Sequence, residues 1–200
     1  MGEHIGSPLQ NGNMHNKFNP AIHHRKSIRL KNYDYSQKGA YFVTICVNNM
    51  VCLFGEIVED KMVLNDAGKM VQTMWNDLSK CFPEIQLDVC AIMPNHLHGI
   101  ISIVGAPPVG AQLEDKRATT RVAPTLGNIV GQFKSISTTE YMRNVKQSHW
   151  PSFDSRLWQR NYYEHVIRND DELNKIREYI IQNPDRWDVG ADQRVCPRKG

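Results

Sequence analysis

Two histidines stand one residue apart in the stretch "AIMPNHLHGIISIV", residues 91 to 104. The apolar run that follows them is typical of a buried strand. Because alternate side chains of a strand point to the same face, His96 and His98 would project together, about 7 Å apart. Two imidazoles so placed can bind a divalent cation if a third ligand comes from another element. The alternative is a structural pair of histidines beside a hydrogen-bonded loop.

A candidate for that third ligand lies in "DELNKIREYIIQNP", residues 171 to 184. The spacing predicts a helix with an apolar stripe, and Tyr179 and Asn183, four residues apart, face the same way at its border. If this helix packs on the histidine side of the strand, the Tyr179 hydroxyl lies beside the metal and the Asn183 amide oxygen can bind it. The alternative for Tyr179 is a boundary residue with a buried ring and a solvated hydroxyl.

The elements that must position these residues follow from the apolar pattern. Strands are expected at 40–49, 85–95, 96–104 and 157–169, with a short hairpin at 54–65. Helices are expected to begin at the caps Asn65, Thr125 and Asn169. This order predicts an α+β fold built on a split β-α-β unit. It has an antiparallel four-stranded sheet, two helices on one face, and an additional C-terminal helix that carries the tyrosine.

Length and composition set limits on the function. Two hundred residues with 40% hydrophobic content suit one domain with one core. A net charge of +3 permits a nucleic-acid partner without requiring one. The five cysteines show no C-x-x-C pairing, and no apolar run reaches the length of a membrane span. These features predict a reduced, cytoplasmic protein without a membrane partner.

The chain divides into an N-terminal arm, a central domain and a tail. Residues 1–36 are polar and without periodicity, residues 37–187 hold the predicted elements, and residues 188–200 form the tail. Residues 105–124 carry Gly, Pro and charge and are expected to form a long loop. The arm ends in "HHRKSIRLK", whose cations are candidate DNA-phosphate contacts or, alternatively, a solvated tail: Arg25, Lys26, Arg29 and Lys31.

Further DNA contacts are expected inside the domain. Lys134 in "GQFKS" and Arg160 are candidate phosphate ligands, although an exposed lysine on a helix often serves only solvation. Tyr162 and Tyr163 lie side by side in the predicted fourth strand, so one would pack inward and the other could stack on a base.

The combination of these motifs resembles a known family. "PNHLHGII" is similar to the HUH motif, two histidines around one hydrophobic residue, and "EYIIQNP" is similar to the tyrosine helix of the single-tyrosine HUH transposases. These are the insertion-sequence type and its relatives, and the resemblance is closest to the REP-associated tyrosine transposases. It covers about residues 24 to 187. The triplet alone is weakly specific, whereas its pairing with a terminal Y-x-x-x-N helix is strong.

The resemblance implies a fold, a mechanism and a substrate. The fold is a ferredoxin-like sheet with the tyrosine helix laid across its active face. His96 and His98 bind a divalent metal, Mg²⁺ or Mn²⁺, with Asn183 as third ligand, and Tyr179 is the nucleophile. The substrate is single-stranded DNA beside a hairpin, cut by transesterification through a 5′-phosphotyrosine. A monomer or a homodimer is compatible with the sequence.

Other classes of function are kept open. A domesticated hairpin-binding or repeat-binding relative without catalysis would share the fold but could dispense with the histidines and the tyrosine. An RNA-recognition sheet of the same topology would present exposed aromatic residues on its central strands. A metal oxygenase with an H-x-H motif would lack the terminal tyrosine helix. The presence of His96, His98, Tyr179 and Asn183 together favours the transposase-like nuclease.

Overall fold

The computed structural model describes residues 34–105 and 124–187. The four arm cations Arg25, Lys26, Arg29 and Lys31, most of the predicted loop at 105–124 and the tail at 188–200 lie outside the described residues. Their predicted roles therefore stay predictions. The remaining candidate residues all lie within the described part of the chain.

Four strands form the main sheet: β1 (Gly39–Cys46), β4 (Ile85–Ile92), β5 (His96–Ile103) and β6 (Tyr163–Ile167). They lie in the order β4-β5-β1-β6, and every neighbouring pair is antiparallel. β1 and β5 are therefore the central strands, and β4 and β6 are the edge strands. This is the topology of a split β-α-β sandwich, so the predicted ferredoxin-like α+β fold is confirmed.

The other elements are a short 3-10 turn, a two-stranded hairpin and four helices. A short 3-10 turn, η1 (Asn48–Met50), precedes the hairpin of β2 (Gly55–Val58) and β3 (Lys61–Leu64). The helices are α1 (Asp66–Asn76), α2 (Leu78–Cys81), α3 (Leu126–Ser148) and α4 (Asp170–Ile181). The three predicted N-caps are confirmed, since the side chains of Asn65, Thr125 and Asn169 each accept a main-chain N–H from the first turn.

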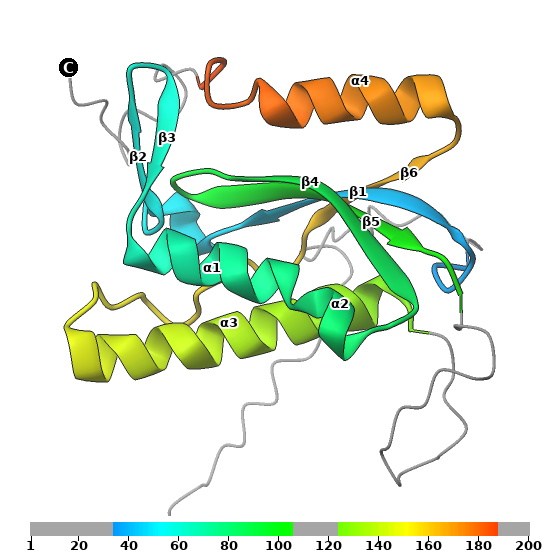
Figure 1. Cartoon of the computed structure of the whole chain (residues 1–200). Helices are drawn as coiled ribbons and strands as arrows, with labels where there is room; N and C mark the ends of the chain where they lie inside the picture. The colour runs from blue at the N-terminus through cyan, green and yellow to red at the C-terminus, as the bar shows by residue number, and fades with distance from the viewer. Residues whose placement is uncertain (1–33, 106–123, 188–200) are drawn as a thin grey trace, which may run out of the picture.

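The helices cover the sheet unequally. Helices α1 and α3 lie on one face and α4 crosses the other (Figure 1). The larger core lies between the sheet and α1 and α3, where Trp75 packs directly on β5. Gly99 makes that contact possible, because a Cβ there would lie 2.3 Å from Cζ2 of Trp75. The additional C-terminal helix is therefore the sole helical cover of the second face within residues 34–105 and 124–187.

The predicted strand at 157–169 is shorter than expected. β6 begins only at Tyr163, and the preceding segment pairs irregularly with the end of β1. The Gln159 N–H donates to the Cys46 carbonyl at 2.9 Å, and the Asn48 N–H donates to the Leu157 carbonyl at 2.8 Å. The regular strand pairing is interrupted here because Nζ of Lys134 in α3 donates hydrogen bonds to the carbonyls of residues 159, 160 and 161.

Two whole-chain expectations can be checked within the described residues. Cys46, Cys81 and Cys90 are free thiols, but Cys52 is disulfide-bonded, so the prediction of fully reduced cysteines is wrong at that position. In the part of the chain that the structure describes, no helix combines the length and the apolar character needed to cross a membrane.

Candidate active site

The histidine pair lies at the start of β5, on the face that α4 covers. His96 and His98 are 9% and 5% exposed. Their Nε2 atoms are 3.1 Å apart and their ring centroids 4.6 Å apart. The rings are thus closer than the about 7 Å expected from strand geometry, because the side chains lean toward each other. Both imidazoles present the same nitrogen to one point, as two ligands of one cation would.

The opposite ring nitrogens are held by oxygen atoms. Nδ1 of His96 lies 2.7 Å from Oδ1 of Asn95, and Nδ1 of His98 lies 2.8 Å from Oγ1 of Thr44. The Asn95 amide nitrogen donates to the Met50 carbonyl at 3.1 Å, which assigns its oxygen as the acceptor. His96 therefore carries its proton on Nδ1, and its Nε2 lone pair points at His98.

The Thr44 hydroxyl makes the second histidine adaptable, because it can either donate or accept. When it donates to Nδ1, His98 carries its proton on Nε2 and donates to Nε2 of His96. When it accepts, both Nε2 atoms present lone pairs. Oxygen partners that fix the outer nitrogens in this way are typical of metal-binding histidines. The donor set therefore fits a divalent cation, for which His96 and His98 provide two ligands.

Burial keeps His98 neutral. Burial, and to a lesser degree the neighbouring His96, lowers the pKa of His98 to about 3. An imidazole must be deprotonated at the nitrogen that binds a metal. His98 is therefore neutral throughout the neutral range, and it presents an unprotonated Nε2 when the Thr44 hydroxyl accepts from its Nδ1.

Tyr179 lies beside the pair. Its ring centroid is 5.4 Å from that of His98 and 6.0 Å from that of Phe42, edge-on to the latter at 87°. Phe42 in turn stacks on His98 at 5.5 Å. Tyr179 is nevertheless 40% exposed. The structure thus places the predicted nucleophile beside His98 and leaves it accessible to a substrate.

Asn183 lies beyond the end of α4 rather than within it. Its N–H donates to the Ile180 carbonyl, three residues back, at 3.3 Å, so the chain has left α-helical geometry. The residue is buried, and within residues 34–105 and 124–187 its amide forms no hydrogen bond with either imidazole. No group of three His, Cys, Asp or Glu side chains suited to a metal occurs there either. Asn183 as third ligand remains a prediction.

The turn after α4 brings a tryptophan to the site. Trp187 is buried and stacks on His96, with ring centroids 5.5 Å apart and planes 27° apart. Trp187 thus packs on His96, whereas Phe42 and Tyr179 pack on His98. Helical or strand periodicity could not indicate this contact, because Trp187 stands outside any regular element.

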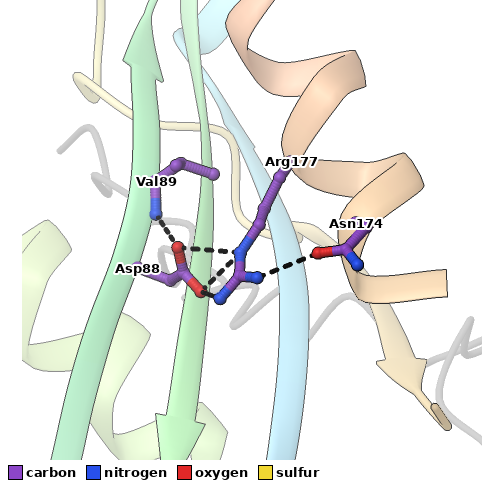
Figure 2. A network of polar contacts seen from close by, with 4 residues as sticks. All are labelled: Asp88, Val89, Asn174 and Arg177. Atoms are coloured by element: carbon purple, nitrogen blue, oxygen red, sulfur yellow. Dashed lines mark hydrogen bonds and ion pairs between the residues drawn. The ribbon is translucent and has the colours of Figure 1, made fainter. Parts of the chain in front are cut away.

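An ion pair fixes α4 across the edge strand (Figure 2). Nε of Arg177 donates to both oxygens of Asp88, at 3.0 and 3.2 Å, and Nη2 donates to Oδ2. Asp88 stands at a bulge in β4 and also accepts the Val89 N–H at 2.7 Å. Hydrogen bonds from Arg177 lower the pKa of Asp88, and the same bonds raise the pKa of Arg177. Because Arg177 precedes Tyr179 by two residues, this pair positions the tyrosine along the sheet.

A second polar tie holds the start of α4. His165 of β6 lies with Nε2 2.7 Å from Oε1 of Glu172, whose other oxygen accepts the Arg168 N–H at 2.7 Å. The helix is thus fastened to both edge strands of the sheet, β4 and β6. Neither tie follows from helical periodicity, which indicates the apolar stripe and leaves the partners of the border residues open.

The two adjacent tyrosines of the predicted fourth strand, of which only Tyr163 lies in β6, point to opposite sides as alternation predicts. Tyr163 lies on the histidine face, 47% exposed, with its ring 6.1 Å from Phe42. Tyr162 is half-buried on the other side, with Nζ of Lys134 5.3 Å from its ring centroid. Tyr163 is therefore a second exposed tyrosine near the site, available for stacking on a base.

The two predicted phosphate ligands of the domain differ in their surroundings. Lys134 donates to the carbonyls of Gln159, Asn161 and Arg160 at 2.9, 3.1 and 3.4 Å, and burial lowers its pKa to about 8. Its ammonium group is therefore engaged in shaping the main chain. Arg160 is exposed on that same segment and is free to contact a ligand.

The amino-acid sequence is similar to those of two proteins of Haemophilus influenzae. No model of a known protein family matches it. An uncharacterized protein of Haemophilus influenzae is 42% identical over 180 residues, which are 88% of this chain and 96% of the relative. The chain belongs to the family of this protein.

A more distant relative has a functional name. A Haemophilus influenzae protein called "Putative REP-associated tyrosine transposase" is 24% identical over 157 residues, 78% of this chain and 76% of that protein. Among solved structures, a REP-associated tyrosine transposase bound to a REP hairpin matches with a TM-score of 0.45 and 19% identity, covering 79% of this chain and 73% of the other. That structural likeness is too weak to assign a function.

Proposed function

We propose that the protein is a metal-dependent endonuclease and strand transferase for single-stranded DNA, of the transposase type, acting beside DNA hairpins. The observation that carries this proposal is the meeting of three side chains: the Nε2 atoms of His96 and His98 converge, and the accessible ring of Tyr179 lies 5.4 Å from His98. The distant relative named as a REP-associated tyrosine transposase supports the same class. The partner is single-stranded or hairpin DNA, the setting is the cytoplasm, and the working unit is a monomer or a homodimer.

The histidines would hold Mg²⁺ or Mn²⁺, with the Asn183 oxygen as the proposed third ligand. When bound, the metal supplies charge neutralisation at the phosphate oxygens and stabilises the leaving 3′ oxygen. Asn95 and Thr44 contribute by fixing the rings of His96 and His98 through their outer nitrogens. To bind the cation, His98 would carry its proton on Nδ1, where the Thr44 hydroxyl can accept it.

Tyr179 would act as the nucleophile. Its phenolic oxygen forms a bond to phosphorus while the bond from phosphorus to the 3′ oxygen breaks. The phenolic proton is released to solvent, and the leaving oxygen takes up a proton to become a free 3′ hydroxyl. A 5′-phosphotyrosine remains, and the 3′ hydroxyl of a second DNA end can reverse the step. The number of phosphodiester bonds is conserved, so no nucleotide cofactor is needed.

The test is cleavage of a hairpin-bearing single strand. EDTA should abolish cleavage and Mg²⁺ or Mn²⁺ should restore it, and His98→Ala should lose most activity with DNA binding retained. His149→Asn is the control, because this exposed histidine caps α3 with a positive φ of 57° that asparagine tolerates. Full cleavage in EDTA would refute the metal role. Hairpin binding without cleavage under any metal would favour the domesticated DNA-binding relative instead.

A further inference from the structure

Each imidazole of the candidate site is stacked on an aromatic ring. The ring centroids of Phe42 and His98 are 5.5 Å apart with the planes at 24°, and those of Trp187 and His96 are 5.5 Å apart with the planes at 27°. The two aromatic residues differ in origin, because Phe42 belongs to the central strand β1 and Trp187 follows the turn at 182–186 beyond α4. The orientation of His96 therefore depends on a part of the chain outside the sheet.

The contact with Trp187 fixes the plane of the His96 ring. The torsion that sets this plane has only a broad preference in histidine, so the surrounding contacts decide it. Asn95 holds one edge of the ring, with its Oδ1 2.7 Å from Nδ1 of His96. Trp187 packs against the face of the ring, where it opposes rotation about that edge. The two contacts together keep Nε2 of His96 directed at His98, 3.1 Å away.

The β2–β3 hairpin supports Trp187. The tryptophan is 8% exposed and forms a small apolar cluster with Ile57 of β2 and with Met93, which follows β4. The hairpin stands beside the C-terminal end of α4, as Figure 1 shows. Trp187 is therefore packed firmly enough to hold a neighbouring ring in place.

The turn beyond α4 joins Trp187 to the helix that carries Tyr179. The Gln182 N–H donates to the Glu178 carbonyl at 2.9 Å, and the Trp187 N–H donates to the Pro184 carbonyl at 3.3 Å. Main-chain hydrogen bonds therefore continue from the helix through the turn. One segment thus places both the predicted nucleophile and the ring that stacks on His96.

A cation on Nε2 of His96 would strengthen the stacking on Trp187. An imidazole that shares its lone pair with a cation becomes electron-poor, and the face of an aromatic ring attracts positive charge within about 6 Å of its centroid. Tryptophan attracts it most strongly among the aromatic side chains. An aliphatic side chain would fill part of the same space without this preference for the metal-bound imidazole.

We propose that Trp187 is a positioning residue of the metal site, which holds the His96 imidazole in its metal-binding orientation and stabilises its metal-bound form. The inference rests on the proposed function, since it takes His96 as a metal ligand. Because the same segment carries Tyr179, correct docking of α4 and a high affinity for the metal depend on each other.

The first experiment measures metal affinity in the absence of DNA. The full chain is titrated with Mn²⁺, the free ion is measured by electron paramagnetic resonance, and the specific binding is the part that His98→Ala removes. Trp187→Leu should weaken this binding about tenfold, as is typical when a group that orients a metal ligand is lost. Trp187→Phe keeps a stacking ring and should stay within about threefold of the wild type. Equal affinities of the wild type and Trp187→Leu would overturn the proposal.

The second experiment changes the electrons of the ring and keeps its shape. Biosynthetic replacement of tryptophan by 5-fluorotryptophan withdraws electron density from the ring face, so it should weaken Mn²⁺ binding by the wild type. The same replacement should have no effect on Trp187→Phe, because the other tryptophans pack elsewhere, Trp75 and Trp158 on Phe133 and Trp150 on Tyr141. Equal responses of the two proteins would contradict a role of the Trp187 ring.

Trp150 provides the control for a loss of stability. It packs edge-on against Tyr141 of α3, with ring centroids 5.2 Å apart. Trp150→Leu should lower the thermal midpoint, because it removes an aromatic contact, and should leave the Mn²⁺ affinity unchanged. If it weakened Mn²⁺ binding as much as Trp187→Leu does, general destabilisation would explain both results and the proposal would be overturned.

The two proposals fail in distinguishable ways. If the wild type binds Mn²⁺ and cuts no DNA, the nuclease proposal fails, while weaker binding by Trp187→Leu still supports the role of Trp187. If the wild type cuts DNA and Trp187→Leu binds Mn²⁺ as tightly as the wild type, the Trp187 proposal fails alone. A wild type without specific Mn²⁺ binding overturns the Trp187 proposal whether or not DNA is cut.

Discussion

The α3-covered and α4-covered faces of the sheet are built from alternate residues of the same strands, yet they differ in chemistry. On the first face the strands contribute fully buried apolar side chains: Tyr41, Val43, Ile45, Leu97 and Ile101. On the second face the apolar cluster is small, formed around Phe42, Ile100, Ile167 and Ile180, and the next positions along the strands are Thr44, His96 and His98. One face supplies most of the hydrophobic core, whereas the other presents groups that can bind a metal.

The difference extends to how the covering helices are held. Trp75 of α1 and Phe133 of α3 meet edge to face in the first core, 5.5 Å apart. Helix α4 relies instead on a short apolar stripe and on two polar ties to the edge strands, Arg177 with Asp88 and Glu172 with His165. Substitutions on the first face should therefore unfold the protein, and substitutions on the second should remove activity from a folded protein.

The largest effect is expected at Tyr179. Tyr179→Phe removes the nucleophilic oxygen and keeps the ring that packs on Phe42 and His98, so the protein should fold, bind the hairpin and give no covalent adduct. Loss of a nucleophile can reduce a rate by about 10⁶-fold. The adduct is measured as a protein–DNA species that survives boiling in detergent.

Tyr163 provides the matched control for Tyr179. It is similarly exposed, lies on the same face and also contacts Phe42. Tyr163→Phe should retain the adduct, and mass spectrometry should find the nucleotide on the peptide "EYIIQNPDR". A nucleotide on the peptide "NYYEHVIR" would show that the strand tyrosine is the nucleophile.

A sharper comparison of the two faces uses adjacent residues of β5. Leu97 is fully buried toward α1 and α3, so Leu97→Ala should cost about 2–5 kcal/mol of unfolding free energy while the remaining folded protein still forms the adduct. His98→Ala should abolish the adduct with a much smaller loss of stability, because His98 contributes to no large apolar cluster. Urea unfolding and adduct yield are measured on both. Equal destabilisation by the two substitutions would contradict the division of labour between the faces.

The features that were predictable from sequence are the local ones. Alternation placed His96 and His98 on one face, and the polar residues Asn65, Thr125 and Asn169 marked the helix starts because a cap acts within one turn. The four-residue step from Tyr179 to Asn183 was less informative, since the chain leaves the helix at Ile181 and the turn instead delivers Trp187 to His96.

The features that were missed depend on contacts between distant parts of the chain. Asp88 and Arg177 are 89 residues apart, and the bulge that exposes Asp88 interrupts the alternation of β4 without a signal in the residue types. Lys134 was predicted as a phosphate ligand on charge alone. Its engagement with three carbonyls depends on the irregular segment at 159–161, which the β-like composition of that stretch concealed.

The smallest effect is expected at the ion pair that positions α4. Asp88→Asn keeps an oxygen for the Val89 N–H and removes the charge that holds Arg177. Helix α4 should therefore be held less firmly in its position against β4, while the protein stays folded. We expect the rate of adduct formation to fall about tenfold or less, as suits the loss of one partly exposed ion pair. Exchange of the two residues, Asp88→Arg with Arg177→Asp, should restore part of the rate, which a merely destabilised variant would not show.

The pH dependence of stability tests the same ion pair. The pKa of Asp88 is lower in the folded state than its ordinary value of 3.8. The pair therefore stabilises the fold above that value, and the stabilisation is lost as the pH falls through the lower, folded-state pKa. The difference in urea midpoint between wild type and Asp88→Asn should be present at neutral pH and shrink under acid conditions. The same difference in urea midpoint is measured for Glu172→Gln, which removes the carboxylate that ties the other end of α4 to His165. If the Asp88→Asn difference persists unchanged in acid, the carboxylate charge does not hold the helix, and the bulge at Asp88 alone sets the place of Tyr179.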